Sequence, residues 1–438
     1  MDSPISPDVG IDTSSSPTEE ATSTCGEAAV SAFVYPLAQQ AALASPGHVN
    51  DAFYPYFQPR RPLTMPRDKA QVDVCHPFPL TNQAGSQVVL AALDCLRPYL
   101  PVSLPLYRRL QFGRFFEDTS CIITNLRQDD IRGSPQSSWT EAQNGKDDAL
   151  SRPWFMAFVD RSCRPETETW VFGTWEAEHD GLAMSGKQNQ EAERLMRGLV
   201  DAVKRLPVLP SMHEAAAGFK NEERVDSVGN SPNEYAAHSD DPNIMLWGAI
   251  HERTMHVLHR MGVIATQYKA SAMPNHTFVF DVAETPTPPP LPKGLIWGEL
   301  HPRHFALVRS RTQIPRQDRT MIDLPSLAIY PSRSPSVAPI AWAFVGLDGS
   351  LTTLHVEPEW RGRGLAKAVA TKLFRECMDG FWEAQIQTKF AHGFVQVGNE
   401  ASARVCKSLG GRSEWECYWL RIDLGKVEDS PRQCPRAQ

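Results

Sequence analysis

The sequence lacks any apolar run long enough to cross a bilayer, and its N-terminus lacks the basic and apolar segments of a secretory signal peptide. It also lacks an excess of positive charge, since 44 Lys and Arg stand against 51 Asp and Glu, a formal net charge of -7. A protein that neutralises nucleic-acid phosphates would need the opposite balance. We therefore expect a soluble cytoplasmic or nuclear protein, with neither a membrane nor a nucleic acid as its partner.

Paired cysteine motifs are also missing. The nine cysteines are scattered, are odd in number and form no CxxC pair, which favours reduced thiols over a disulfide framework or a zinc site. The segment HERTMH resembles a metalloprotease motif, but His251 and His256 are five residues apart. On a helix they would lie about 140° apart and could not share an ion. No metal is expected.

Proline marks the main division of the chain. The tract TPTPPPLP at 285–292 favours a stiff polyproline II spacer. It separates two expected α/β domains, at 80–285 and 286–425, and residues 293–425 are expected to form a separable unit. The Ser-, Thr- and Pro-rich start predicts a disordered or irregular extension over 1–79, and 426–438 a disordered tail.

Helical and strand patterns occur in both parts of the chain. The first part predicts strands at 153–160, 169–178 and 276–284 and helices at 85–100, 191–206 and 243–262. The second predicts strands at 325–332, 388–397 and 414–424, a hairpin at 338–358 that turns at Asp348-Gly349, and helices at 298–311, 363–378 and 399–411.

The segment HVEPEWRGRGLAKAV at 355–369 places a strand, two glycines and a helix in succession. Glycine lets the backbone approach a ligand closely, and the following helix directs free N–H groups at the same place. Arg361 and Arg363 add charged donors. The segment resembles the pyrophosphate-binding signature of the GNAT acyl-CoA N-acyltransferases, Arg/Gln-x-x-Gly-x-Gly/Ala, with Arg361, Gly364 and Ala366 at its defining positions.

The resemblance continues in NEASARVCKSLG, where Asn399, Leu409 and Gly410 fall in register with a family pattern, and it is closest to the glycine N-acyltransferase-like branch. It implies a GNAT fold in the C-terminal half, a mixed and mostly antiparallel sheet with splayed fourth and fifth strands, preceded by a degenerate GNAT-like half. It also implies that acetyl-CoA or another acyl-CoA binds at a set of residues that comprises Leu354, His355, Val356, Arg361, Gly362, Arg363, Gly364, Leu365, Ala366 and Asn399.

In the reaction that the resemblance implies, an amine attacks the thioester of acyl-CoA and must lose a proton. Several residues are candidates for moving that proton. Ser350 stands where the branch carries the glutamate that acts as general base. Cys406 stands where the family often has a tyrosine that acts as general acid. His392 is the preferred base. It is two residues from Phe394 on the predicted strand, so both side chains lie on the same face. A packed core histidine is equally consistent with the pattern.

Three further assignments stay open at this stage. His355 is the rival base, and Glu357 acting through water is the third candidate. Cys406 could donate a proton to the leaving thiolate, although core packing suits it better.

The resemblance implies an acyl-CoA-dependent N-acyltransferase, most simply an N-acetyltransferase, that acylates an amine of a small molecule or amino acid. Acylation of a protein or a hydroxyl group is an alternative. So is a catalytically inactive CoA-binding or scaffold protein, because both the usual glutamate and the usual tyrosine are missing.

Overall fold

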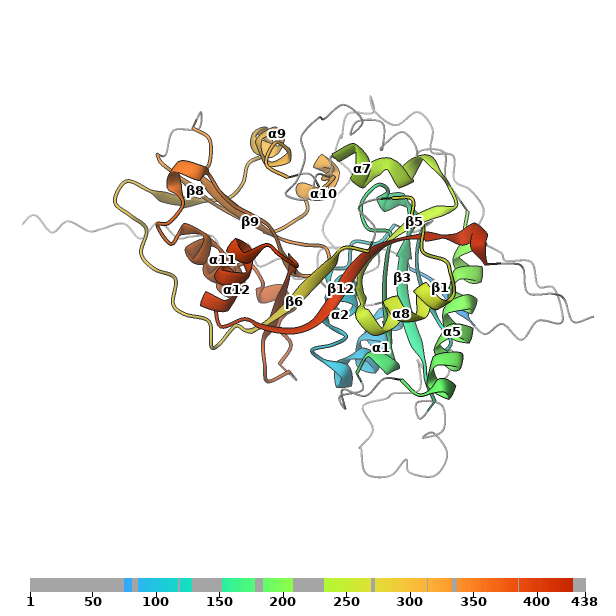
Figure 1. Cartoon of the computed structure of the whole chain (residues 1–438). Helices are drawn as coiled ribbons and strands as arrows, with labels where there is room; N and C mark the ends of the chain where they lie inside the picture. The colour runs from blue at the N-terminus through green and yellow to red at the C-terminus, as the bar shows by residue number, and fades with distance from the viewer. Residues whose placement is uncertain are drawn as a thin grey trace, which may run out of the picture. The chain divides into compact units, whose positions relative to one another are not determined.

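A computed structural model describes residues 75–80, 86–116, 119–127, 152–177, 184–207, 232–268, 272–312, 314–332, 337–384 and 386–427 (Figure 1). All of them belong to one compact unit. Of the irregular extension expected over 1–79, residues 1–74 lie outside the described part, whereas 76–79 form a strand. Of the tail expected over 426–438, residues 428–438 lie outside it, whereas Val427 is buried. Residues 128–151 and 208–231 also lie outside it. Among the described residues, no helix is long and apolar enough to span a membrane.

The N-terminal half, up to the proline tract, contributes six strands. They are β1 (His76–Pro79), β2 (Ser120–Thr124), β3 (Phe155–Asp160), β4 (Thr169–Gly173), β5 (Ile244–His251) and β6 (Pro274–Asp281). Its helices are α1 (Gln87–Leu96), α2 (Leu104–Phe112), α5 (Gly186–Lys204), α7 (Pro232–Ala236) and α8 (Glu252–Arg260). Helix α5 begins in a capping box between Ser185 and Gln188, which satisfies backbone donors at its first turn.

The C-terminal half repeats this order of elements. Its strands are β7 (Ile296–Gly298), β8 (Ser326–Tyr330), β9 (Ala341–Val345), β10 (Ser350–Val356), β11 (Phe390–Gln396) and β12 (Arg412–Asp423). Its helices are α9 (Phe305–Arg309), α10 (Asp318–Met321), α11 (Leu365–Glu376) and α12 (Glu400–Ser408). The predicted hairpin at 338–358 is confirmed, and Gly349 in its turn has a φ of 74° that only glycine adopts readily.

The strands form one twelve-stranded sheet in the order β1-β2-β3-β4-β5-β12-β6-β11-β10-β9-β8-β7. Two neighbouring pairs run parallel, β4 with β5 and β10 with β11, and the other pairs are antiparallel. The mixed, mostly antiparallel sheet expected from the sequence is therefore confirmed, and each half contains one parallel pair at the corresponding place.

The two halves exchange strands at the centre of the sheet. Strand β12, from the end of the chain, lies between β5 and β6 of the N-terminal half. Strand β6 in turn lies between β12 and β11, and seven of its residues pair with β11. A unit starting at residue 293 would lose β6 and leave β11 unpaired on that side. This argues against the separable unit expected at 293–425, and the ranges 80–285 and 286–425 are two halves of one sheet.

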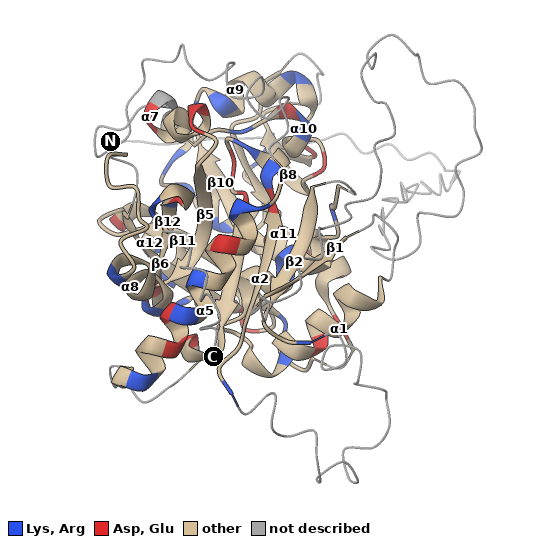
Figure 2. Ribbon diagram, turned by 90° about the vertical axis from the view of Figure 1, so that its right-hand side faces the viewer, with Lys and Arg blue, Asp and Glu red and all other residues tan. Residues whose placement is uncertain are grey.

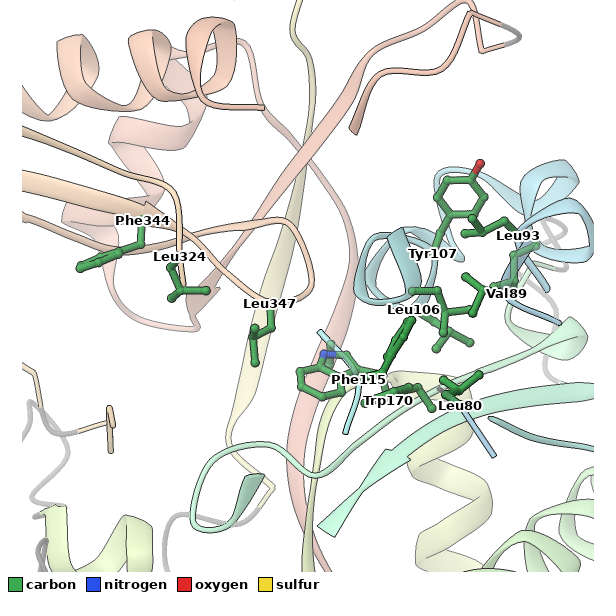
Figure 3. Packing of buried hydrophobic residues seen from close by; sticks show 14 of the residues in the cluster. Leu80, Val89, Leu93, Leu106, Tyr107, Phe115, Trp170, Leu324, Phe344 and Leu347 are labelled. Carbon is green, nitrogen blue, oxygen red and sulfur yellow. The ribbon is translucent and has the colours of Figure 1, made fainter. Parts of the chain in front are cut away.

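The hydrophobic core also runs through both halves. One cluster joins side chains of α1, α2, β3 and β4 to side chains of β8, β9, α9 and the segment after α10. Figure 3 shows Leu80, Phe115 and Trp170 of the N-terminal half in the same cluster as Leu347 and Phe344 of the C-terminal half. Burial of this apolar surface stabilises the halves together rather than separately.

Two predicted helices are wrong in whole or in part. The segment 243–262 begins as β5, and only its second part is the helix α8. Every residue of β5 is buried because the strand has neighbours on both sides and covered faces, so the alternation that identifies a strand is missing. The segment 298–311 contains only the five-residue α9 after a short turn. The other elements expected from the sequence lie within a few residues of their predicted bounds.

Candidate functional site

Strands β10 and β11 separate after two paired residues. Ser350 pairs with His392 and Leu351 with Gly393, and no further pairing joins these strands. Beyond that point Thr352–Val356 of β10 and Phe394–Gln396 of β11 have no strand partner on the sides that face each other. We call this region between the two strands the wedge. Its backbone N–H and C=O groups are available to a ligand that lies along it.

A bulge lies at the start of the wedge. The register of β10 with β9 shifts between Thr352 and His355, and Thr353 has a φ of 55°. A β-branched residue in this left-handed region is strained, and such strain is characteristic of functional sites. The bulge turns backbone groups of β10 away from β9, so that they can point into the wedge.

The glycine loop lies at the other end of β10. Gly362 and Gly364 have φ values of 75° and 77°, and a Cβ built on either would meet no atom within 4 Å. Gly364 is followed at once by the first turn of α11, whose leading N–H groups have no partners within the helix. The conformation therefore requires glycine, and the space in front of the loop is open.

Two arginines frame this loop. Arg361 donates from Nε to the carbonyl of Val356 over 2.9 Å, and Arg363 donates to the carbonyl of Glu359 over 3.3 Å. The guanidinium of Arg363 also lies 4.7 Å from the ring centroid of Trp360. All four residues of the loop from Arg361 to Gly364 are exposed. Positive and negative residues are mixed over the ribbon as a whole (Figure 2), so this pair of cations is a local feature.

Two family models match the chain. Residues 79–278 match the N-terminal domain of the acyl-CoA N-acyltransferase verG, and residues 329–420 match the FR47-like protein family. The second range contains β10, the bulge, the glycine loop and β11. These matches support membership of the GNAT superfamily of acyl-CoA N-acyltransferases.

Solved structures with a similar arrangement include three that this chain covers almost completely. A Drosophila protein has 15% identity and a TM-score of 0.46, over 80% of this chain and 98% of its own. A tandem GNAT protein of the clavulanic acid biosynthesis pathway has 9% identity and a TM-score of 0.39, over 80% and 99%. A GCN5-related N-acetyltransferase from Sphaerobacter thermophilus has 10% identity and a TM-score of 0.39, over 80% and 96%. The search of curated proteins gave no match.

The remaining residues predicted to bind CoA lie around the wedge and loop of this GNAT-like half. Leu354 lies within the bulge of β10 and Val356 beyond it, while Leu365 and Ala366 belong to the first turn of α11. Leu365 is buried and contributes to the core under the loop. Asn399 caps α12, where its side-chain oxygen accepts the N–H of Ser402 over 3.1 Å.

His392 lies at the closed end of the wedge, where β10 and β11 still pair. Its ring contacts that of Phe394 edge-on at 5.2 Å, so both point to the same face, as their parity predicts. The side chain is fully buried and neither ring nitrogen has a hydrogen-bond partner. Burial lowers the pKa of His392 to about 4, partly opposed by the charge of Asp348, with Arg108 lowering it further. The imidazole is therefore neutral at pH 7.

His355 lies on the open part of β10. Its ring stacks on Trp342 of β9 with centroids 4.6 Å apart, and its Nε2 is 3.6 Å from Oε2 of Glu357. The His355 side chain is 16% exposed, against none for His392. Burial lowers the pKa of His355, while Glu357 raises it. Glu357 itself accepts the Nε of Arg311 over 3.0 Å, which holds the carboxylate beside the imidazole.

Cys406 does not lie on the wedge. It belongs to the buried side of α12 and packs in the cluster formed with α11 and β9. Burial raises the pKa of its thiol to about 12. A thiol with this pKa would not give its proton to a thiolate of ordinary basicity, so the packing role that the sequence also allowed fits the structure better.

Sequence reasoning missed the segment between α9 and α10. Arg311 reaches Glu357 at one end of the wedge, and Arg316 donates from Nη2 to Oγ1 of Thr352 over 2.8 Å at the other. It also missed the role of Asp348, which was used only to predict the hairpin turn. The buried carboxylate of Asp348 accepts the N–H of Ser350 over 3.1 Å. No sequence motif links Arg311, Arg316 and Asp348 to the site, because the first two reach it from the segment between α9 and α10 and the third from the turn between β9 and β10.

The N-terminal half has a corresponding parallel pair that is filled. β4 pairs with β5 at Thr169 and Trp170, but the sequence between β4 and α5 lacks the Arg/Gln-x-x-Gly-x-Gly/Ala signature. A Cβ built on Gly173, at the end of β4, would lie 2.3 Å from the ring of Trp175. A Cβ on Gly248 of β5 would lie 2.5 Å from Thr167 and 2.9 Å from Trp419. The chain's own side chains thus pack closely against both glycines of this pair.

Two other features do not belong to the site. A hollow of about 570 Å³ is lined by Leu291, Leu295, Ile296 and Trp297, beside the edge strand β7 and away from the wedge residues. Among the described residues no group of three or more His, Cys, Asp or Glu side chains could hold a metal ion. His256 and His259 are exposed on α8, while His251 is buried at the end of β5.

Proposed function

We propose that this protein is an acyl-CoA-dependent N-acyltransferase whose active site is the wedge of the C-terminal half. The observation that carries the proposal is the sequence of a bulged, unpaired strand and a loop with two left-handed glycines at a helix N-terminus. The loop fits a pyrophosphate, because its N–H groups and two arginines surround open space. The pantetheine arm would extend from there along β10 towards Thr353.

In this reaction a neutral amine attacks the thioester carbonyl, the carbonyl oxygen becomes negatively charged, and the thiolate of CoA leaves. Holding both reactants in place can lower the barrier by about 7–11 kcal/mol. A backbone N–H turned into the wedge by the bulge at Thr353 would stabilise the oxyanion, a contribution of about 3–4 kcal/mol for one preset donor. Both effects depend on a rigid β10 rather than on one reactive side chain.

We place His355 first as the group that takes the amine proton, reversing the order that the sequence suggested. A base must reach the substrate, and His355 lies on the unpaired part of β10 with a partly exposed ring. Glu357 would orient the imidazole and stabilise its charged form, while Arg311 fixes Glu357. His392 is neutral as well, but it is buried where the strands still pair.

The acceptor we propose is an amine of a small molecule or an amino acid, and the acyl donor acetyl-CoA or another acyl-CoA, as expected for the glycine N-acyltransferase-like branch. The missing glutamate at Ser350 favours one alternative, a protein that binds CoA without turnover. We also propose that the protein acts in the cytoplasm. Transfer to a protein or a hydroxyl group would use the same wedge.

The test is release of free thiol from acetyl-CoA, a longer acyl-CoA and an aromatic acyl-CoA, each with pools of amines, amino acids and alcohols. Mass spectrometry of the products identifies the acylated atom. We expect thiol release that depends on both an acyl-CoA and an amine. CoA binding without any release, across all donors and acceptors, would favour the inactive CoA-binding protein.

A further inference from the structure

The segment that connects α9 and α10 is fastened to β10 and the residue after it at two points. Arg311 binds Glu357 just after β10, and Arg316 binds the hydroxyl of Thr352, next to the strained residue of the bulge. Among the described residues, Arg316 makes a hydrogen bond to Thr352 and to no other residue. Arg316 therefore has the geometry to hold the backbone of β10 at the bulge.

The next residue along the chain is held by the N-terminal half. The backbone N–H of Gln317 donates to Oε1 of Glu166 over 3.0 Å, and the Gln317 side chain donates to the carbonyl of Arg164 over 2.8 Å. Thr320 in α10 donates to Oε2 of the same glutamate over 2.6 Å. Glu166 and Gln317 are both buried, so these bonds are little exposed to competing water.

We propose that the N-terminal half, whose sequence lacks the glycine signature, positions the bulge of the C-terminal half through Glu166, Gln317, Arg316 and Thr352. This inference rests on the proposed function, because it concerns the backbone that would stabilise the oxyanion. Glu166 and Arg316 are positioning residues and touch no reacting atom.

The physical reason lies in Thr353. A β-branched residue with a φ of 55° persists only where its surroundings hold it there. Thr352, immediately before it, is bonded through its hydroxyl to Arg316, and that hydroxyl lies 3.5 Å from that of Thr353. Loss of this support lets β10 relax towards a regular strand paired with β9, and the N–H that faced the wedge then turns away.

The chain offers a matched control at a second contact between the halves. Glu383, before β11, accepts a hydrogen bond from the hydroxyl of Tyr107 over 2.6 Å and from Arg97 over 3.0 Å. It is a partly buried carboxylate that joins the halves, like Glu166, but its partners lie in the segment from α1 to α2 and it makes no contact with the residues of the bulge.

The experiment compares Glu166→Ala, Arg316→Met and Glu383→Ala, with Glu166→Gln and Arg316→Lys as conservative variants for the case that the first two fail to fold. Hydrogen exchange is followed in the peptide that covers 352–356, together with CoA affinity and kcat. In Glu166→Ala and Arg316→Met we expect hydrogen exchange in that peptide to become faster and kcat to fall by about tenfold or more. CoA affinity should stay within about twofold of the wild type. The conservative variants should recover part of the loss, and Glu383→Ala should show neither effect.

The double variant Glu166→Ala/Arg316→Met should be no worse than the stronger single variant, because both residues act on the same segment. The inference is overturned if folded Glu166 variants leave both exchange and kcat unchanged, or if Glu383→Ala produces the same changes. The exchange measurement needs no turnover. If it responds as expected in a protein that transfers no acyl group, the positioning stands and the proposed function fails.

Discussion

Arg361 and Val356 are joined by a 2.9 Å hydrogen bond from the guanidinium Nε to the backbone carbonyl, which ties the start of the glycine loop to the end of β10. The cation is therefore in place before a phosphate arrives, and the loop keeps a fixed position relative to the wedge. A preset donor contributes more to binding than one that must first be ordered. The loop proposed to bind the pyrophosphate is thus tied to the strand proposed to hold the thioester, β10.

The first prediction concerns the number of CoA molecules bound per chain. Trp175, Thr167 and Trp419 pack closely against the glycines of the parallel pair in the N-terminal half, and the glycine signature is missing between β4 and α5. Calorimetric titration should therefore give one site per chain. A second site of comparable affinity would contradict this account of the N-terminal half.

The second prediction concerns the strand exchange. A specific protease site introduced into 285–292 should be cut without separating the halves, because β12 pairs with both β5 and β6. Native size exclusion should show the two fragments eluting together, and denaturant should separate them. A freely released C-terminal fragment that still binds CoA would show that the halves fold independently.

The third prediction tests the proton acceptor. His355→Ala should lower kcat by about 10²–10⁴-fold while CoA affinity changes little. Since burial lowers the pKa of His355, the wild-type rate should fall on the acid side only below about pH 6.5, and the variant should lose this limb. The exposed His259 on α8 supplies a matched control, His259→Ala. If His355→Ala keeps most of its activity and His392→Ala does not, the role belongs to His392.

The fourth prediction follows from the buried His392. Its pKa is about 4 in the folded protein and about 6.5 in an unfolded chain. Between these values the unfolded state binds a proton that the folded state does not, so stability is present above pH 6.5 and is lost as the pH falls towards 4. Urea unfolding should show the wild type losing about 1.4 kcal/mol per pH unit more than His392→Asn in this range. Equal slopes would mean that the ring is protonated in the fold.

Much of the C-terminal half could be predicted because its signals are local. Asp348-Gly349 marks a turn by its backbone preferences, and Arg361, Gly364 and Ala366 lie within six residues of one another. Alternation along β11 was enough to place His392 and Phe394 on one face. Patterns of this kind depend on neighbours in the sequence, so no structure is needed to see them.

The rest depends on contacts between distant residues. Nothing in the segment 412–423 indicates that β12 would lie between β5 and β6, because a buried strand looks the same beside any partner. Arg316 and Glu166 are ordinary polar residues until the fold brings them to the two ends of one short segment. The burial of His392 was equally invisible, since it comes from packing in the assembled sheet.

The most direct test of the central claim is calorimetric titration of CoA into the wild type and Gly364→Val. Gly364 has a φ of 77° and faces open space, so valine would both strain the loop and occupy the space of the pyrophosphate. Gly262→Val is the matched control, because Gly262 has a φ of 70°, also faces open space and follows α8 in the N-terminal half. We predict that Gly364→Val loses at least tenfold in CoA affinity, about 1.4 kcal/mol, and that the control keeps it. Unchanged affinity in a folded Gly364→Val protein would contradict the assignment of this loop to CoA.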